Sequence, residues 1–591
     1  MEKKTLLKRF LIWRIRHLPT QPYLMILSLL TGIGSGLAAV VIYNLVHFIQ
    51  SVLHSGLSKE YFNYLYLVYP VIGISLAVFF IKFILKQRIG HGIPSVLYAI
   101  SKNHGYIKAH NMFSSVITSA LTVGFGGSVG LEGPTVATGG AIGSNIGRLL
   151  HLTFKHRMLL LGCASAGAMA AIFKAPIAAV VFAFEVIMID LTTSSIVPIL
   201  IAAASGTLTS YAFLGQNVIY KVEVIGRFQF DDLPFYIVLG ILTGLMSVYF
   251  TKVYMFIGQL FEKIKHSYNK LIIGGLSLGI IILFFPSLYG DGYESVNEAL
   301  HGSYDFIFTN SFFSSYSDNI IVVLILILVI TLMKVVATSI TFGSGGIGGI
   351  FAPTLFMGAN TGLLFASFIK YLGFKDISIN NYVLVGMAGL IAGVLHAPLT
   401  GLFLIADLTQ GYALFMPLMI TATISYATIK YFEPNNVYTI QLAKRKELLT
   451  HHADKNVLTL MKVRQILETD FKKINKDATL GDLVHAVSES PRNIFPIVDL
   501  DNIFLGVVTL NDIRHIMFKP EEYDSIYVKD LMHVPSTSVS LNDSMEDVAH
   551  KIQHSRRFNI VVLEDGKYIG FVSRANVFSN YRRILKNISA H

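Results

Sequence analysis

The pentapeptide Gly130-Leu131-Glu132-Gly133-Pro134 places a carboxylate between two glycines and a proline, inside a strongly apolar part of the chain. It has a counterpart at Gly348-Gly349-Ile350-Phe351-Ala352-Pro353, and both segments continue as Pro-Thr with a glycine nine residues after the proline. An ionisable side chain within a membrane segment is costly and is a functional-site hypothesis by default. The two segments therefore predict a duplicated transporter built around the starts of helices.

The composition is that of a polytopic membrane protein. Hydrophobic residues make up 53% of 591 positions and charged residues only 14%, against about 25% in ordinary soluble domains. The net charge of +11 comes largely from basic clusters that flank the apolar region, at residues 3–16 and 444–446. This placement predicts a multi-pass protein of the cell membrane with both termini cytoplasmic, and it argues against a nucleic-acid partner.

The apolar segments are uneven in length. A helix needs about 20 apolar residues to cross the bilayer, so the short pieces between glycines indicate half-helices and re-entrant elements. We expect a polytopic α-helical membrane protein with two inverted repeats and broken or re-entrant helices, followed by an α/β domain. The expected divisions are a cytoplasmic N-terminal segment at 1–20, a transmembrane domain at 21–446 with repeats at about 21–215 and 232–431, and a soluble domain at 447–591.

Four pairs of segments support the internal repeat, because they match in the same order. The third pair in chain order is Pro134-Thr135 with Pro353-Thr354, in the two segments described above. The others are Thr31-Gly32 with Thr243-Gly244, Gly90-His91-Gly92 with Gly290-Asp291-Gly292, and Ala175-Pro176 with Ala397-Pro398, the last pair followed nine residues on by Glu185 and Asp407.

Three glycine- and proline-rich segments are candidate helix starts, at 90–94, 130–134 and 348–353. Free N–H groups at a helix N-terminus bind an anion without the deep trapping that a lysine would cause. Glycine permits close backbone approach, and proline is tolerated in the first turn. The motif glycines and prolines are Gly130, Gly133, Pro134, Gly348, Gly349 and Pro353.

Glu132 would then lie beside an anion site. Its carboxylate could occupy that site itself and leave when protonated, and so act as a gate. The alternative is a structural carboxylate that caps the helix N-terminus; the flanking glycines favour the gate.

These residues resemble the CLC family of chloride channels and chloride/proton exchangers, over nearly the whole chain. The resemblance implies that Glu132 is the gating glutamate and that the amides of Ile350 and Phe351 bind the anion. It places a family tyrosine, whose hydroxyl points at the central anion, on Tyr438, for which the alternative is an interfacial aromatic anchor. It also implies a homodimer with a separate pore in each subunit.

The first anion-binding loop departs from the family pattern. The family's loop serine is replaced by His91, followed by Gly92. A neutral imidazole can donate one hydrogen bond, and a protonated one adds a full charge. The expected substrate is therefore chloride or a related anion. In the alternative His91 faces a neighbouring helix and the backbone alone binds the ion.

The second departure concerns protons. Family exchangers often carry an internal glutamate where this chain has Val186, directly after Glu185. Family channels carry valine there, although some prokaryotic exchangers also lack this acid. We therefore expect a glutamate-gated chloride channel of the voltage-gated type, with an anion/proton exchanger as the alternative. We expect Glu185 to be a structural or cytoplasmic-edge acid and not a substitute proton relay.

The tail resembles a tandem pair of CBS domains, at about 455–518 and 526–588. Such pairs often bind adenine nucleotides, and the family's Thr-x-x-Asp turn falls on Thr509 and Asp512. The alternative is an ordinary helix cap. The second copy has Ser573 and Asn576 instead, which predicts at most one nucleotide site. Transport itself requires no cofactor.

Other classes fit less well. A CBS-regulated divalent cation transporter would need several carboxylates in the membrane half, and the chain offers mainly Glu132, Glu185 and Asp407. The sequence shows no metal cluster, paired nucleophile and base, or Walker-type loop, so we expect no enzyme and no catalytic or metal site. The single Cys163 lies in a Gly/Ala-rich run, where a packed thiol is expected.

Overall fold

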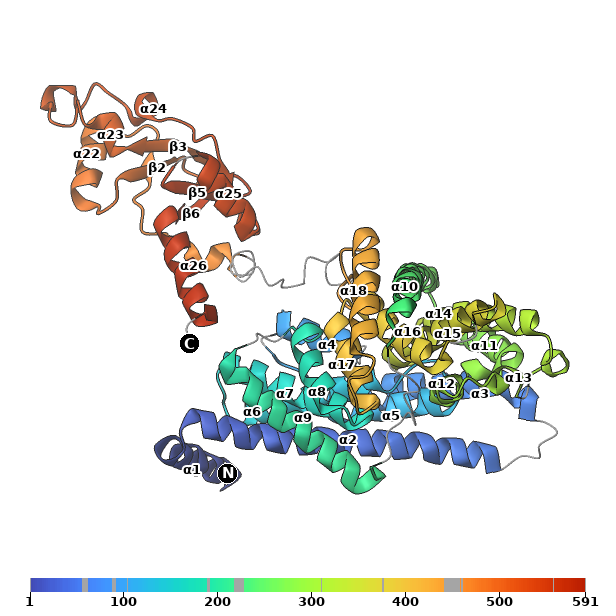
Figure 1. Ribbon diagram of the computed structural model, residues 1–591. Coiled ribbons are helices and arrows are strands. Elements are labelled where there is room, and N and C mark those ends of the chain that lie inside the picture. The colour runs from blue at the N-terminus through green and yellow to red at the C-terminus, as the bar shows by residue number, and fades with distance from the viewer. Residues whose placement is uncertain are drawn as a thin grey trace. The chain divides into compact units, whose positions relative to one another are not determined.

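The computed structural model describes residues 2–55, 62–87, 92–101, 103, 105–188, 192–216, 228–309, 311–374, 377–440, 458, 461–555 and 557–589. The chain forms two compact units, Met1–Leu448 and Leu449–His591. The first is helical throughout its described elements, and the second combines short strands with helices (Figure 1).

The first half of the helical unit begins with α1 (Glu2–His17) and the long α2 (Thr20–Ser55). It continues with α3 (Phe62–Phe79), the π-helical η2 (Phe80–Leu85), α4 (Gly92–Ser101), α5 (Asn111–Gly124), α6 (Glu132–Leu149), α7 (Phe154–Phe173), α8 (Pro176–Glu185) and α9 (Thr193–Leu214).

The second half begins with η3 (Phe230–Asp232) and the long α10 (Leu233–Lys263). It continues with α11 (Ser267–Phe284), η4 (Pro286–Leu288), α12 (Tyr293–Leu300), α13 (Asp305–Phe308), η5 (Ser314–Tyr316), α14 (Ile320–Gly343), α15 (Phe351–Tyr371), α16 (Ile379–Val394), α17 (Pro398–Leu408) and α18 (Phe415–Phe432).

The two halves use the same packing pairs in the same order. Helix α2 packs on α9 as α10 packs on α18, and α6 packs on α7 as α15 packs on α16. The glycines of the first matched pair allow these contacts, because a Cβ at Gly32 would lie 2.0 Å from Ser205 Oγ and a Cβ at Gly244 would lie 2.5 Å from Thr428 Cβ. The repeat read from the sequence thus corresponds to equivalent helix pairs.

The helix lengths agree with a membrane protein that contains incomplete spans. Within the described part of the chain, eight helices are long and apolar enough to cross a bilayer. Four shorter apolar helices, α4, α8, α16 and α17, have between 10 and 16 residues. The polytopic helical fold predicted from the sequence is confirmed.

The second unit contains two three-stranded sheets built alike. In each sheet a parallel strand joins an antiparallel hairpin, and a helix follows the hairpin directly. The first has β1 (Ile474–Asn475), β2 (Ile494–Val498) and β3 (Phe504–Thr509) with α22 (Leu480–Glu489), α23 (Leu510–Ile513), η6 (Pro520–Glu522) and α24 (Val528–Leu531). The second has β4 (Ser538–Val539), β5 (Asn559–Glu564) and β6 (Lys567–Ser573) with α21 (Val463–Ile466), α25 (Met545–Ser555) and α26 (Arg574–Ser589).

Candidate functional site

The starts of α6 and α15 meet at a two-fold pair of backbone hydrogen bonds. Gly130 N–H donates to Gly349 O at 2.8 Å, and Gly349 N–H donates to Gly130 O at 2.7 Å. The two glycines are equivalent in the repeat and form an antiparallel bridge. A Cβ at Gly349 would lie 2.8 Å from Gly133 N, so side chains here would force the two helix starts apart. The two-fold pair is the arrangement that inverted repeats produce.

Helix α4 starts at the same place. Gly92 has φ +53°, and a Cβ there would lie 3.2 Å from Gly133 Cα. The three predicted helix starts therefore converge, as Gly92, Gly133 and Gly349 show. His91, predicted to contact the anion, lies outside the described residues.

Glu132 is the first residue of α6, and its side chain is fully buried. The Tyr293 hydroxyl donates a hydrogen bond to Glu132 Oε1. Glu132 Oε2 is buried and accepts no hydrogen bond from any described residue, although the Ala352 amide at the start of α15 lies close to the carboxylate. The carboxylate thus lies between two helix starts with one oxygen available.

The start of α15 offers amides to an anion. Ile350 precedes the helix without a side-chain cap, and Phe351 is its first residue. Helix geometry leaves the first N–H groups of such a helix without intrahelical partners. Both side chains are buried, and the Phe351 ring packs 5.2 Å from that of Phe173.

Tyr438 lies near this junction. Its side chain is 5% exposed, and its buried hydroxyl has no hydrogen-bond partner among the described residues. It is close enough to Glu132 and Tyr254 to interact with them electrostatically. A buried phenol usually finds a partner, so an unpaired hydroxyl beside Glu132 suits an ion that completes the site.

Val186 lies at the end of α8, away from the starts of α6 and α15, and its side chain is fully buried. The neighbouring Glu185 caps α17: its carboxylate accepts hydrogen bonds from Leu399 N at 3.1 Å, Thr400 N at 2.7 Å and Thr400 Oγ1 at 2.7 Å. The structural role predicted for Glu185 agrees with these bonds.

Sequence reasoning missed three residues around the gate. Tyr293, at the start of α12, holds Glu132. Lys334 is fully buried in α14 and donates to Ser128 Oγ at 2.9 Å. Asp291 lies close enough to both Lys334 and Glu132 for electrostatic interaction. Lys334 could have been identified from the sequence, because a charge within an apolar helix marks a functional position. The Tyr293 contact could not, because it depends on tertiary packing.

In the soluble unit Thr509 and Asp512 bond to each other. Thr509 N and Thr509 Oγ1 both donate to Asp512 Oδ2 at 2.7 Å, which forms a capping box at α23. His533 Nδ1 lies 3.6 Å from the same oxygen. In the second copy Ser573 donates to Glu468 instead.

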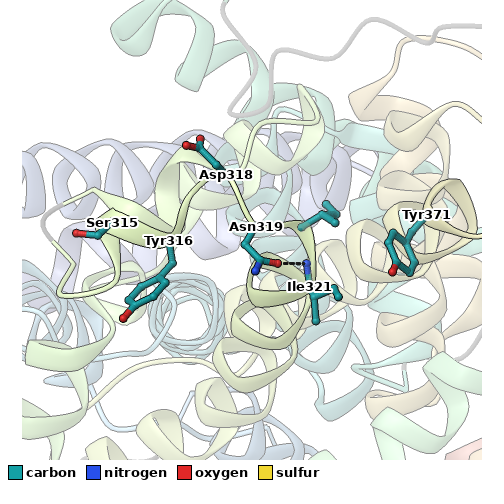
Figure 2. Close-up of a pocket in the computed structure, with 7 residues that line it drawn as sticks. Ser315, Tyr316, Asp318, Asn319, Ile321 and Tyr371 are labelled. Atoms are coloured by element: carbon teal, nitrogen blue, oxygen red, sulfur yellow. Dashed lines mark hydrogen bonds between the residues drawn. The ribbon is translucent and has the colours of Figure 1, made fainter.

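A surface hollow of about 450 Å³ lies at the start of α14 and the end of α15. Figure 2 shows its lining, where Asn319 Oδ1 accepts a hydrogen bond from Ile321 N at 3.1 Å. That bond caps α14. None of the gate residues lines this hollow.

Comparison with known proteins gives consistent matches. The chain is 29% identical to the H(+)/Cl(-) exchange transporter ClcA of Vibrio vulnificus over an alignment covering 69% of this chain and 86% of that protein. It is 26% identical to the chloride channel protein CLC-f of Arabidopsis thaliana, covering 68% of this chain and 56% of that protein. The solved structure of a eukaryotic CLC transporter matches with a TM-score of 0.60 and 18% identity, over 94% of this chain and 97% of that one.

The family models divide the chain as the structure does. The CBS domain model matches residues 463–519 and 528–583, and the voltage gated chloride channel model matches residues 72–430. The family comprises transporters and channels rather than enzymes. With its repeated helix starts and two CBS-type sheets, the chain belongs to the CLC family of voltage-gated chloride channels and related anion transporters, and it carries a tandem CBS pair.

Proposed function

We propose that this chain conducts chloride or a related anion across the cell membrane past a gate formed by Glu132. The observation that carries the proposal is the position of that carboxylate, fully buried between the starts of α6 and α15 with one oxygen unpaired. When ionised, the carboxylate takes the place of an anion at the helix starts. When protonated, it loses its attraction to the helix N-termini and yields the site.

The anion ligands are neutral. The amides of Ile350 and Phe351 and the hydroxyl of Tyr438 supply donors, and the α4 start adds Gly92 and His91. Donors without full charge bind an anion firmly enough for entry and loosely enough for release. A protonated His91 would tighten the site and slow release.

The mode of anion transport that we propose is passive conduction. Val186 is apolar and buried, and the carboxylate of Glu185 is committed to capping α17. Neither residue is then free to pass protons to Glu132 from the other side. A second candidate, exchange of anions for protons, is favoured by the name of the Vibrio relative and by the protonation that the gate itself requires.

One recording separates the two modes. Purified protein in liposomes with a chloride gradient is followed by a chloride electrode and an external pH electrode together, with and without a proton ionophore. Rapid chloride flux without proton movement establishes a channel. Uphill proton movement driven by chloride establishes an exchanger that works with valine at position 186. Absence of any anion flux, with the protein intact, contradicts the proposal.

The CBS pair is the proposed regulatory part, placed in the cytoplasm with both termini, and the protein acts as a homodimer. Thr509 and Asp512 would contact the phosphate and ribose of one adenine nucleotide, which requires their mutual hydrogen bonds to be exchanged for bonds to the ligand. Calorimetric titration with ATP tests this, since Asp512→Asn should abolish binding of one nucleotide per chain. Ser573→Ala, in the second copy, is the matched control and should retain it.

A further inference from the structure

Helix α14 carries a lysine in a fully buried position. Lys334 Nζ donates to Ser128 Oγ at 2.9 Å and to Gly290 O at 3.3 Å, and it lies 4.8 Å from the centre of the Phe356 ring. A buried ammonium is strongly unfavourable unless negative charge lies nearby. Both of these hydrogen-bond acceptors are neutral, so the compensating charge comes from elsewhere.

Two carboxylates supply that charge. Asp291 and Glu132 both interact electrostatically with Lys334 and with each other. Asp291 is fixed in the turn before α12, because its Oδ1 accepts a hydrogen bond from Tyr293 N at 3.2 Å. The same Tyr293 donates its hydroxyl to Glu132, so one residue joins both carboxylates.

The described residues around the cluster add little further charge. On α2, the side chains of His47 and Tyr43 interact electrostatically with Asp291. The His47 side chain is solvent-exposed. Among the residues that the structure describes, Tyr438 also interacts electrostatically with Glu132. Glu294 follows Tyr293 in α12 but is exposed to solvent.

The charge balance of this cluster is uneven. Two ionised carboxylates and one ammonium leave one negative charge uncompensated inside the protein, which is unfavourable. One bound proton removes the imbalance. Groups that interact this strongly titrate as a unit rather than singly.

We propose that Glu132, Asp291 and Lys334 form a single buried proton-binding site in which the two carboxylates share one proton, so that Asp291 and Lys334 set the pH at which the gate opens. Asp291 retains partial exposure and is the member through which the proton enters and leaves. The inference rests on the proposed gating by Glu132, because it assigns the groups that control protonation of that gate.

The two partners must act in opposite directions. In Asp291→Asn the ammonium compensates Glu132 alone, so the gate holds its proton less well and the flux midpoint moves toward acid pH. In Lys334→Met two carboxylates lie close together without a cation, so the midpoint moves toward alkaline pH. A neighbouring charge of this kind shifts a titration by about one pH unit or more, and the double variant Asp291→Asn/Lys334→Met should return close to the parent.

The experiment measures chloride efflux from liposomes against pH for the parent, both single variants, the double variant and the control Glu294→Gln. Glu294 is an acid in the first turn of α12, three residues after Asp291, and its exposure to water should leave the midpoint unchanged. In parallel, the infrared band of protonated carboxyl groups is titrated in each variant, with Glu132→Gln identifying the Glu132 contribution. This second readout requires no transport.

Opposite shifts of the two single variants, cancelled in the double variant, support the shared site. Shifts in the same direction, or none, overturn it. If the parent shows no pH-dependent flux, the gating proposal fails on its own, and the infrared titration still decides whether Asp291 and Lys334 control the proton on Glu132. Should Lys334→Met fail to fold, an unshifted infrared midpoint in Asp291→Asn alone suffices to refute the proposal.

Discussion

Glu185 and Asp407 occupy equivalent positions at the ends of α8 and α17, and each caps the other's helix. Asp407 Oδ2 accepts hydrogen bonds from Ile177 N at 3.0 Å and Ala178 N at 3.1 Å, while Glu185 binds the corresponding amides of Leu399 and Thr400. The two helices therefore run antiparallel, and the reciprocal caps join the two halves of the membrane unit.

Loss of either cap should destabilise the fold. Glu185→Ala leaves the first amides of α17 without an acceptor, and replacement of a good N-cap costs about 0.5–2 kcal/mol. Asp407→Ala should cost a similar amount, because the geometry is equivalent. Denaturant unfolding in detergent measures both, with the exposed Glu294→Gln as the control. Unchanged stability together with altered proton coupling in Glu185→Ala would show a transport role instead.

The anion ligands predict a change in selectivity. Removing the Tyr438 hydroxyl in Tyr438→Phe, together with His91→Ser, should alter the flux ratios among chloride, nitrate and fluoride. Loss of one hydrogen bond to a charged group is worth about 1.5–3 kcal/mol, or roughly tenfold or more. The control is Tyr371→Phe, at the far end of α15. Ratios identical to the parent would leave the backbone as the sole ligand.

Much of this arrangement was readable in the sequence. The Gly130–Pro134 segment and its repeat predicted helix starts, because glycine pairs and prolines mark such starts directly. The CLC family and the tandem CBS tail predicted from the motifs are confirmed. The proposed roles of Glu132 and Tyr438 remain predictions.

The contact between Tyr293 and the gate could not be predicted in this way. Tyr293 begins a short helix that packs against α15 and α16, and no local pattern aims its hydroxyl at Glu132. Reciprocal capping by Glu185 and Asp407 follows from the antiparallel pairing of α8 and α17. The repeat placed both acids at the same position, but only the tertiary structure shows that each reaches across to the other helix.

The second CBS copy contains an ion pair between helix α25 and the turn that precedes it, and this pair predicts a pH-dependent contribution to stability. Lys551 Nζ lies 2.8 Å from Asp543 Oδ2 and holds the pKa of that carboxyl below its usual range. A lowered pKa in the folded state means stability that is present above the unfolded value, about 3.9, and lost as the pH falls through the folded value.

The partly exposed pair should contribute no more than about 1 kcal/mol. Lys551→Met should remove this contribution near neutral pH and have little effect in strong acid, as measured by denaturant unfolding of the soluble unit within the full chain. The control is Lys567→Met, on β6. Equal destabilisation by Lys551→Met at both pH values would instead indicate a packing effect of the lysine stem.

The central claim is that protonation of Glu132 opens the anion path, and the Glu132→Gln variant tests it most directly. Glutamine has the shape of the protonated carboxyl and cannot ionise. Chloride efflux from liposomes would be recorded for parent and variant between about pH 4 and about pH 8, a range that spans the titration of ordinary and buried carboxyls. The account predicts flux in the variant that is high and nearly independent of pH, whereas parent flux rises as the pH falls. A variant that retains the parent's pH dependence would contradict the account and place the gate on another group.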